Sequence, residues 1–387
     1  KTYSLMKPMR RYWRTQKVQH KIYFDHASTT SLNHEVKESY IKLLDKYYNS
    51  DALYDDGVAI YRMQEESRVR ILNLLGIKNA NLIFTSGASE ANSLAIKGLA
   101  FNNPNKKHLV TSIYEHASVY NSFKQLEDLF SYEVTYLKPD KDGMIGVDDI
   151  KKHIRPDTLL VSIMHVNNEI GSINDIDSIG KYIKENSQAY FHSDITQSLG
   201  KIDIPFENLD LASFSAHKIH GLKGSGALVY KNHLDLSALI SGGQQEYGIR
   251  GGTSNAPTNI VLAKTVRIAL EGQKKHATYV KELHDYLISK LKDLRVEINS
   301  SDRGIDNLIN FSTSIKSEVL LNHFNLHGIM VSSRSTCGSR ENEPSRVLKS
   351  IGVDDEYAIR ISVNEENNRQ EIDYFIDVLK EAIEKYG

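Results

Sequence analysis

The chain has 387 residues, of which 40% are hydrophobic and 25% are charged, and its 48 Lys and Arg residues nearly balance 49 Asp and Glu residues. This composition is typical of a globular protein long enough for two packed domains, and it excludes a collagenous or a disordered chain. A net charge of −1 gives no broad basic surface, so nucleic acid is not favoured as a partner. No apolar run approaches membrane-spanning length, because the strongest long run, at residues 158–166, is interrupted by Ser162 and His165.

The chain contains one cysteine, Cys337. It can therefore form no intrachain disulfide, and no zinc site with two thiolates can form within one chain. We expect a reducing compartment, and the cytoplasm is the default location.

Residues 1–21 are a basic lead-in with seven Lys or Arg residues and no acidic residue. This segment lacks the apolar core of a secretory signal, and we interpret it as a solvated segment. Two alternatives stay open: a transit-peptide remnant, which would place the protein in an organellar matrix, and an accessory nucleic-acid-binding arm.

From residue 22 onward, apolar runs rich in β-formers alternate with amphipathic helical patterns. Helices are expected at 90–100, 118–129 and 176–184. The alternation predicts an α/β domain with a mainly parallel sheet that is covered by helices on both faces. The expected strands are at 22–24, 82–85, 108–112, 134–137, 159–166, 189–194, 211–214 and 226–230.

The glycine-rich stretch 242–252 ends this alternation, and a long helix over 259–294 follows it. We therefore expect a large domain at residues 22–256, a smaller α+β domain at 257–387, and a ligand site in the cleft between them. In the smaller domain, strands are expected at 308–313, 329–333 and 358–363, and helices at 319–326, 344–351 and from residue 370.

Lys218 ends the segment 213–218 (SFSAHK), where an apolar strand finishes. A lysine at that place is partly desolvated, which lowers the pKa of its amine and favours a Schiff-base nucleophile. Taken alone, Lys218 is better explained as a surface lysine that follows a strand.

Two other segments favour the nucleophile. Asp194 ends the preceding strand, and residues 83–90 (IFTSGASE) form a strand, a turn and a helix start whose backbone N–H groups can face an anion. These are the parts that pyridoxal 5′-phosphate requires, because a lysine forms the imine, a carboxylate keeps the pyridine nitrogen protonated, and a helix start holds the phosphate.

From residue 22 to the C-terminus, the sequence resembles the cysteine desulfurases, which are pyridoxal-phosphate enzymes of fold type I in the class V aminotransferase group. Each segment that carries the resemblance is weak alone, and together they are specific. In chain order they are 23–30 (YFDHASTT), 85–92 (TSGASEAN), 115–119 (EHASV), 164–171 (MHVNNEIG), 194–197 (DITQ), 213–218 (SFSAHK), 248–253 (GIRGGT), 335–339 (STCGS) with 343–345 (EPS), and 359–362 (IRIS).

The resemblance implies which residues hold the cofactor. Lys218 would carry it as an aldimine and move protons, and His116 would stack on its ring and assist in proton transfer. Asp194 would pair with the ring nitrogen, and Gln197 would bond the ring hydroxyl. The phosphate would be held by Ala88, Ser89, Ser215 and His217, with Thr253 reaching it from the partner subunit of a homodimer.

The resemblance also implies a substrate site. Asn168, which would also contact the cofactor, and Arg360 would bind the carboxylate of the substrate, Arg360 through a bidentate fork.

Cys337 can be assessed from its neighbours as well. A free cysteine is more often a small buried hydrophobe, but residues 332–342 have the polar composition of a loop. Arg334 and Arg340 would favour the thiolate, which is the form that attacks sulfur. We therefore interpret Cys337 as a nucleophile that accepts sulfur as a persulfide.

The leading hypothesis is an L-cysteine desulfurase, which transfers sulfur to Cys337 through an external aldimine and releases L-alanine. The sulfur would pass to an acceptor protein, either an iron–sulfur scaffold or an enzyme of tRNA or cofactor thiolation. The alternatives are a related aminotransferase or selenocysteine lyase in which Cys337 is dispensable, and a catalytically idle binding partner. No metal site is expected, because the pair His217 and His220 has no third ligand motif nearby.

Overall fold

A computed structural model describes residues 21–333 and 344–387. The basic lead-in up to residue 20 and the segment that contains Cys337 lie outside the described residues.

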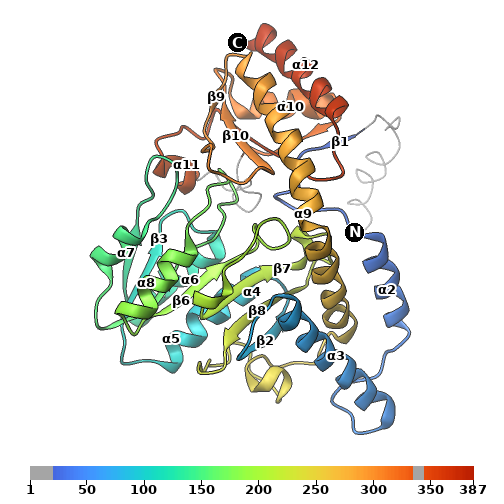
Figure 1. The fold of residues 1–387 in the computed structure, drawn as a ribbon, viewed down its shortest axis with the longest axis vertical. Helices are drawn as coiled ribbons and strands as arrows, with labels where there is room; N and C mark the ends of the chain where they lie inside the picture. Colours follow the sequence, from blue (N-terminus) through green and yellow to red (C-terminus); the bar gives the residue numbers. More distant parts are fainter. Residues whose placement is uncertain (1–20, 334–343) are drawn as a thin grey trace, which may run out of the picture.

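The largest sheet of the described chain has seven strands in the spatial order β2-β8-β7-β6-β5-β3-β4 (Figure 1). β4, β3, β5, β6 and β7 run parallel to one another, whereas β8 is antiparallel to both β7 and β2. The predicted mainly parallel sheet is therefore confirmed. The strands are β2 (Ala80–Thr85), β3 (His108–Ser112), β4 (Glu133–Leu137), β5 (Thr158–Ser162), β6 (Tyr190–Asp194), β7 (Leu211–Ser215) and β8 (Gly226–Lys231).

Helices cover both faces of this sheet. Successive residues of a strand point to opposite faces, and here both sets are buried against helices. Val110 and Val161 pack in one buried cluster, and their neighbours Leu109 and Leu160 pack in another. The first cluster includes side chains of α3 (Asp55–Leu74), α8 (Ile176–Asn186) and α9 (Ala256–Lys292); the second includes those of α4 (Ala88–Ser93), the π-helical turn η1 (Leu94–Gly98), α5 (Leu99–Asn102) and α6 (Ala117–Phe130).

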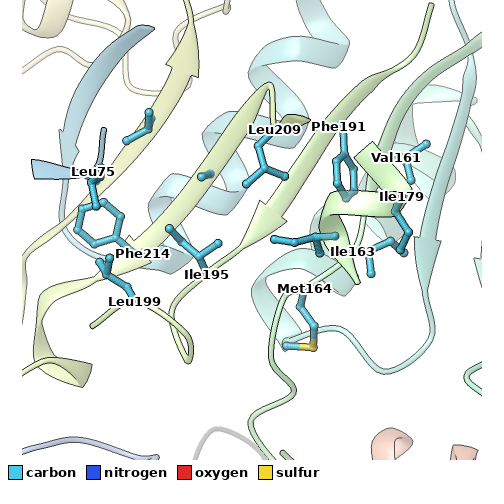
Figure 2. Close-up of a cluster of buried hydrophobic side chains, with 14 of the residues drawn as sticks. Leu75, Val161, Ile163, Met164, Ile179, Phe191, Ile195, Leu199, Leu209 and Phe214 are labelled. Carbon is cyan, nitrogen blue, oxygen red and sulfur yellow. The ribbon is translucent and has the colours of Figure 1, made fainter. Parts of the chain in front are cut away.

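Helix α8 shows how the sequence produces this packing. Asp175 caps its first turn by accepting a hydrogen bond from the backbone N–H of Ser178. Ile176, Ile179 and Ile183 share one face at helical spacing and are fully buried. Figure 2 shows Ile179 beside Phe191 of β6 in this cluster. Burial of each such side chain contributes about 1.5–3 kcal/mol to folding.

A smaller antiparallel sheet has the order β12-β10-β9, and a further pair joins β1 to β11 in parallel. Helices α10 and α12 and the second half of α9 pack on the smaller sheet in one cluster. The elements of this part are β1 (Ile22–Tyr23), β9 (Glu297–Ile298), β10 (Leu308–Ser312), α10 (Ser317–Leu326), β11 (Ile329–Met330), α11 (Arg346–Ser350), β12 (Ala358–Ser362) and α12 (Arg369–Tyr386).

The first and the last described segments of the chain meet in this smaller part. The strand expected at 22–24 pairs with β11, and Ile22 and Phe24 pack in the cluster of the smaller sheet. Helix α9 begins at Ala256. Its first half packs against the large sheet, through Leu262, and its second half packs against the smaller sheet, through Leu283. The division at 256/257 stays a prediction.

Helices α2 (His34–Leu44), α3 and α7 (Val147–His153) were not among the expected elements. Within residues 21–333 and 344–387, none of the helices combines the length and the apolar character that a transmembrane span requires.

Candidate active site

Polar side chains gather where β6 and β7 end. The carboxyl ends of parallel strands meet at one edge of a sheet, which is where α/β proteins bind ligands. Asp194 is the last residue of β6, and Ser215 is the last residue of β7. A 3₁₀ turn, η3 (Ala216–Lys218), follows β7 and places Lys218 beside them.

The amine of Lys218 is held by the N-terminal segment. Its Nζ donates hydrogen bonds to the carbonyl oxygens of Ala27 and Ser28, both at 2.6 Å. The backbone N–H of Thr30 in turn donates to the carbonyl of His217 at 2.9 Å. Residues 27–30, far away in sequence, therefore fix the lysine turn from one side.

The carboxylate of Asp194 is buried and oriented on both oxygens. Its Oδ2 accepts a hydrogen bond of 2.7 Å from Nδ2 of Asn92, and its Oδ1 accepts one of 2.9 Å from the backbone N–H of Thr196. Asn92 also donates to Oγ of Ser118 at 2.9 Å. This network ties the end of β6 to α4 and α6, so the carboxylate is held before any ligand binds.

His116 caps helix α6, on which Ser118 lies. Its Nδ1 accepts a hydrogen bond from the backbone N–H of Ser118 at 3.2 Å and lies 2.8 Å from the hydroxyl of the same residue. Burial lowers the pKa of His116, with Asp194 opposing that shift and Lys218 adding to it. The ring is therefore neutral near pH 7. Because Nδ1 accepts a hydrogen bond, Nε2 carries the proton of the neutral ring.

The turn between β2 and α4 forms a compact cradle. Gly87 has φ 148°, a conformation that favours glycine, and the backbone N–H of Ala88 donates to Oγ of Ser215 at 2.6 Å. A Cβ at Gly226 would lie 2.6 Å from Cα of Gly87, so glycine is required where β8 passes the turn. Ser89 is exposed at the helix start.

Two further predicted residues lie beside Lys218. His217 has Nδ1 3.2 Å from Oγ1 of Thr29, and burial, together with the charge of Lys218, lowers its pKa to about 4. Gln197 donates from Nε2 to the carbonyl of Ala27 at 2.9 Å and accepts from Nζ of Lys201 at 3.0 Å. Gln197 and Lys218 therefore share one acceptor, the carbonyl of Ala27.

Arg360 of β12 approaches the same segment from the smaller sheet. Its Nη2 donates to Oδ1 of Asp25 at 2.7 Å and to Oγ of Ser28 at 2.6 Å, and its Nη1 donates to the carbonyl of Asn168 at 2.8 Å. The side chain is almost fully buried, and its Nε has no hydrogen-bond partner among the described residues. Through Ser28 and its neighbour Ala27, the guanidinium of Arg360 is linked to the amine of Lys218.

Two predicted residues are not brought into this group. Thr253 is exposed on its loop, and its expected role toward a second subunit stays a prediction. Cys337 lies outside the described residues. The flanks of its segment are anchored close to the site: the backbone of Ser332 pairs with that of Arg360, and Oγ of Ser345 donates to Oε2 of Glu169 at 2.6 Å.

A cavity of about 590 Å³ adjoins this group. It is lined by Lys218, Lys201, His26 and Asn364 among others, but not by Asp194, His116 or Ser215. It therefore opens beside the lysine rather than over the carboxylate and the cradle.

The donor set fits pyridoxal 5′-phosphate. A strand-end amine, a fixed and buried carboxylate, a neutral imidazole and a hydroxyl with backbone N–H groups at a helix start are the groups that this cofactor uses. The tight Gly87–Gly226 contact leaves no room for a Cβ at Gly226, and Oγ of Ser215 lies beside the N–H of Ala88 at this helix start, where an anion can be bound.

Comparison with known proteins agrees with this site. The model of the aminotransferase class-V family matches residues 22–375. The chain belongs to the class V aminotransferase family. It is 39% identical over 376 residues to cysteine desulfurase IscS of Dictyoglomus turgidum, a match that covers 94% of this chain and 95% of that protein. The predicted family is confirmed.

Solved structures give the same result. This class V aminotransferase superposes on a NifS-like protein with a TM-score of 0.87 and 31% identity, covering 94% of this chain and 99% of that one. It also superposes on SspA in complex with cysteine, with a TM-score of 0.78 and 33% identity, covering 88% of this chain and 98% of that one. Members of the family use pyridoxal 5′-phosphate, as predicted.

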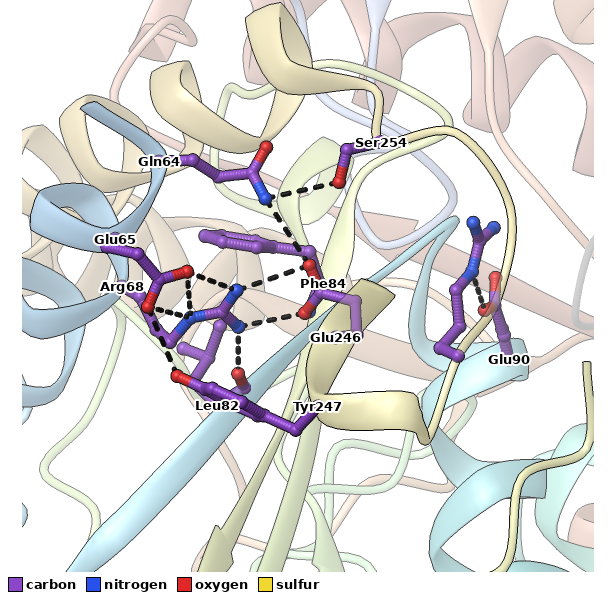
Figure 3. Close-up of polar contacts among 10 residues, drawn as sticks. Gln64, Glu65, Arg68, Leu82, Phe84, Glu90, Glu246, Tyr247 and Ser254 are labelled. Atoms are coloured by element: carbon purple, nitrogen blue, oxygen red, sulfur yellow. Dashed lines mark hydrogen bonds and ion pairs between the residues drawn. The ribbon is translucent and has the colours of Figure 1, made fainter. Parts of the chain in front are cut away.

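Sequence reasoning missed several residues that organise the site. Asn92 lies in the segment 85–92, but its hydrogen bond to Asp194 connects positions 102 apart in the chain. Arg68 and Glu246 form a buried ion pair of 2.8 Å that fixes the segment after Gly243 against β2 (Figure 3). Neither Arg68 (in QEESRVRI) nor Glu246 (in GGQQEYGI) stands in a sequence context that marks it as buried, so the sequence offers no local signal for this pair.

Proposed function

We propose that this protein is an L-cysteine desulfurase that uses pyridoxal 5′-phosphate. The observation that carries the proposal is the link between Lys218 and Arg360 through residues 25–28. An amino acid whose carboxylate binds at Arg360 would present its α-amino group toward the amine of Lys218. The similarity to cysteine desulfurase IscS over 94% of the chain supports L-cysteine as that amino acid.

The described residues have separate tasks in this proposal. Bound at this site, the cofactor withdraws electrons from the α-carbon of an amino acid. Asp194, held by Asn92 and Thr196, would keep its ring nitrogen protonated, and Ala88, Ser89, Ser215 and His217 would hold its phosphate. Lys218 would move protons, and His116, neutral near pH 7, would assist it.

Asn168 and Arg360 would orient the substrate. Arg360 is held by Asp25, Ser28 and the carbonyl of Asn168, and its Nε is buried with no hydrogen-bond partner in the described part of the chain. A substrate carboxylate that accepts from Nε would satisfy this donor, and a bidentate fork with Nη2 would require it to displace the hydroxyl of Ser28.

Cys337 would receive the sulfur. Its thiolate attacks the sulfur of bound L-cysteine, an S–S bond forms and the C–S bond breaks. A proton is added to the carbon, L-alanine leaves, and Cys337 keeps the persulfide. Cys337 follows Ser332 by five positions, and five residues span up to about 18 Å, so a chain anchored beside Arg360 is long enough to bring a thiol to the substrate.

The test is a Cys337→Ala variant assayed with L-cysteine. We expect loss of sulfur transfer and of coupled alanine formation by at least about 100-fold, because the attacking group is gone, with the cofactor absorbance retained. Cys337 is the one cysteine of the chain, so thiol labelling of the wild-type protein reports directly on its persulfide.

Two outcomes would contradict the proposal. Undiminished sulfur release by the variant would indicate an aminotransferase or selenocysteine lyase in which Cys337 is dispensable. A wild-type protein that binds no cofactor after reconstitution would reject the role of Lys218. Arg360→Lys is the matched control: it should raise KM for L-cysteine while leaving the labelled thiol in place.

The proposed setting is a homodimer in the cytoplasm that passes sulfur to an acceptor protein, an iron–sulfur scaffold or a thiolation enzyme. An exposed aromatic patch supports the dimer: Tyr47 stacks on Tyr48, Tyr48 contacts Tyr54, and Leu53 is 94% exposed. Aromatic side chains that are exposed together are enriched at protein interfaces.

A further inference from the structure

A second cluster of chemistry-bearing side chains lies in the smaller part of the molecule, among residues that have no place in the proposed reaction. His323 lies in the last turn of α10, and His327 follows at the end of that helix, one helical turn later. Glu381 faces both rings from α12. The imidazole centroids of the two histidines are 4.5 Å apart.

The ligand atoms of these three residues converge on one point. Oε1 of Glu381 lies 4.0 Å from Nε2 of His323, and its Oε2 lies 3.7 Å from Nε2 of His327. The set spans no more than 4.8 Å between any two ligand atoms. These distances are too long for direct hydrogen bonds, and they leave room for an ion between the groups.

His323 is the buried member of this cluster. The residue is 3% exposed, and its Nε2 is buried with no hydrogen-bond partner among the described residues. A buried polar nitrogen without a partner is destabilising, so such groups are rare unless something else satisfies them.

Backbone hydrogen bonds hold both rings in the orientation of metal ligands. Nδ1 of His327 lies 2.9 Å from the carbonyl oxygen of His323, so Nδ1 donates and Nε2 keeps its lone pair. His323 has a hydrogen bond to the backbone of Val378, on the neighbouring helix α12. Histidines that bind metals characteristically donate their second nitrogen in this way.

We propose that His323, His327 and Glu381 bind a divalent transition-metal ion of the zinc type. Two imidazole nitrogens and one carboxylate are ligands that Zn²⁺ prefers, whereas Mg²⁺ and Ca²⁺ require oxygen ligands. Glu381 is about half exposed, so solvent can complete the coordination and the carboxylate can close onto the ion.

The site would act on the stability of the smaller part. Helices α10 and α12 contact each other directly, and a bound ion would cross-link them. Gly328 follows His327 and leads into β11, which pairs with β1 at the start of the described chain. The ion would therefore fix α10, and the turn that leads from it to β11 and β1, against α12. This inference does not depend on the proposed desulfurase activity.

The test is zinc binding to the holoenzyme in a Cys337→Ser background, which removes the thiol as a competing ligand. Equilibrium dialysis with Zn²⁺ should give one ion per chain, and zinc should raise the Tm by about 3 °C at saturation. Co²⁺ should produce a visible d–d band, and Mg²⁺ should produce no shift.

The variants His327→Ala and Glu381→Ala should weaken zinc binding at least about tenfold and abolish the Tm shift. Both side chains are at least partly exposed, so these variants should fold even if a change at buried His323 does not. His284→Ala is the matched control, because His284 also faces two carboxylates, Asp285 and Asp306, and should bind as before. No bound zinc in the Cys337→Ser background, or a shift that survives in His327→Ala and Glu381→Ala, would overturn the proposal.

Discussion

Glu115 is a fully buried carboxyl group that precedes His116 in the chain. Its Oε1 accepts hydrogen bonds from the hydroxyl of Ser112 at 2.8 Å and from the backbone N–H of Met164 at 2.9 Å. Burial outweighs these bonds and raises the pKa of Glu115 to about 8, with a further contribution from the charge of Asp194. In the folded protein Glu115 is therefore mostly protonated at neutral pH. It then carries no negative charge that would repel the carboxylate of Asp194.

The pH dependence of stability follows from this shift. The folded-state pKa of Glu115 lies above its unfolded value, so its contribution to stability is fully present below about pH 4.5 and is lost as the pH rises through 8. Glu115→Gln keeps the Oε1 acceptor and removes the titration. When the pH is raised from 5 to 8.5, the wild type should lose roughly 2–4 kcal/mol of unfolding free energy relative to Glu115→Gln. Urea unfolding midpoints of the two proteins at each pH measure this difference. Parallel pH profiles of the two proteins would contradict this assignment.

Local motifs explain why part of the site could be predicted from sequence. Asp194 ends β6, Lys218 ends the short turn that follows β7, and the segment 85–92 is a strand, a turn and a helix start, so a short window contains the signal. The partner of Arg360 could not be found in this way, because Asp25 lies 335 positions away. Tertiary packing alone decides such a contact.

A buried ion pair fixes the segment after the glycine-rich stretch. Arg68 of α3 donates to both oxygens of Glu246, and the backbone N–H of Phe84 in β2 donates to Oε2 at 2.9 Å (Figure 3). Glu246 and Tyr247 adopt φ values of 48° and 60°, which cost energy for residues with side chains. The ion pair holds this strained turn against β2, the strand that leads into the cradle at Gly87.

We expect Glu246→Gln to lower the unfolding free energy by about 3 kcal/mol, because it leaves the guanidinium of Arg68 buried and only partly compensated. Glu65→Gln removes the other carboxylate of Arg68, which is 28% exposed, and should cost no more than about 1 kcal/mol. Denaturant unfolding of both variants checks the contrast. Equal losses would show that the buried pair has no special role.

The same contacts explain which elements could be predicted. Strands and helices of the large sheet follow apolar periodicity, and the mainly parallel sheet that they predict is confirmed. Helix α3 was not expected, because the burial of Gln64 and Arg68 breaks the apolar pattern and depends on partners near residue 250. The strand at residue 22 was expected, but its pairing with β11 depends on the C-terminal fold and leaves no local signal.

At the scale of the whole molecule, distant segments converge on the site. Residues 25–30 contact Lys218 from the large sheet and Arg360 from the small one, and α9 packs on both buried clusters. All of these contacts are made within one chain. The proposed role of Thr253 differs, because this residue is exposed on its own chain and would serve the site of a partner.

This difference between contacts within a chain and contacts across a dimer can be measured by mixing inactive chains. Lys218→Ala co-expressed with Thr253→Ala should recover activity at limiting pyridoxal 5′-phosphate, because random assortment gives about a quarter of all sites both native residues. Lys218→Ala with Arg360→Ala is the matched control. Arg360 lies on the same chain as the Lys218 that it is linked to, so no site regains both residues, and activity should stay at the level of the parents.

Recovery in the control pair would contradict the single-chain geometry of Lys218 and Arg360. No recovery in the Thr253 pair, with mixed dimers verified by two affinity tags, would show that Thr253 does not act across subunits. Leu53→Asp places a charge in the exposed aromatic patch and tests whether the subunit interface lies there. A monomer that loses cofactor affinity to the same degree as Thr253→Ala would locate the subunit interface at this patch, because only the loss of the partner connects the two changes.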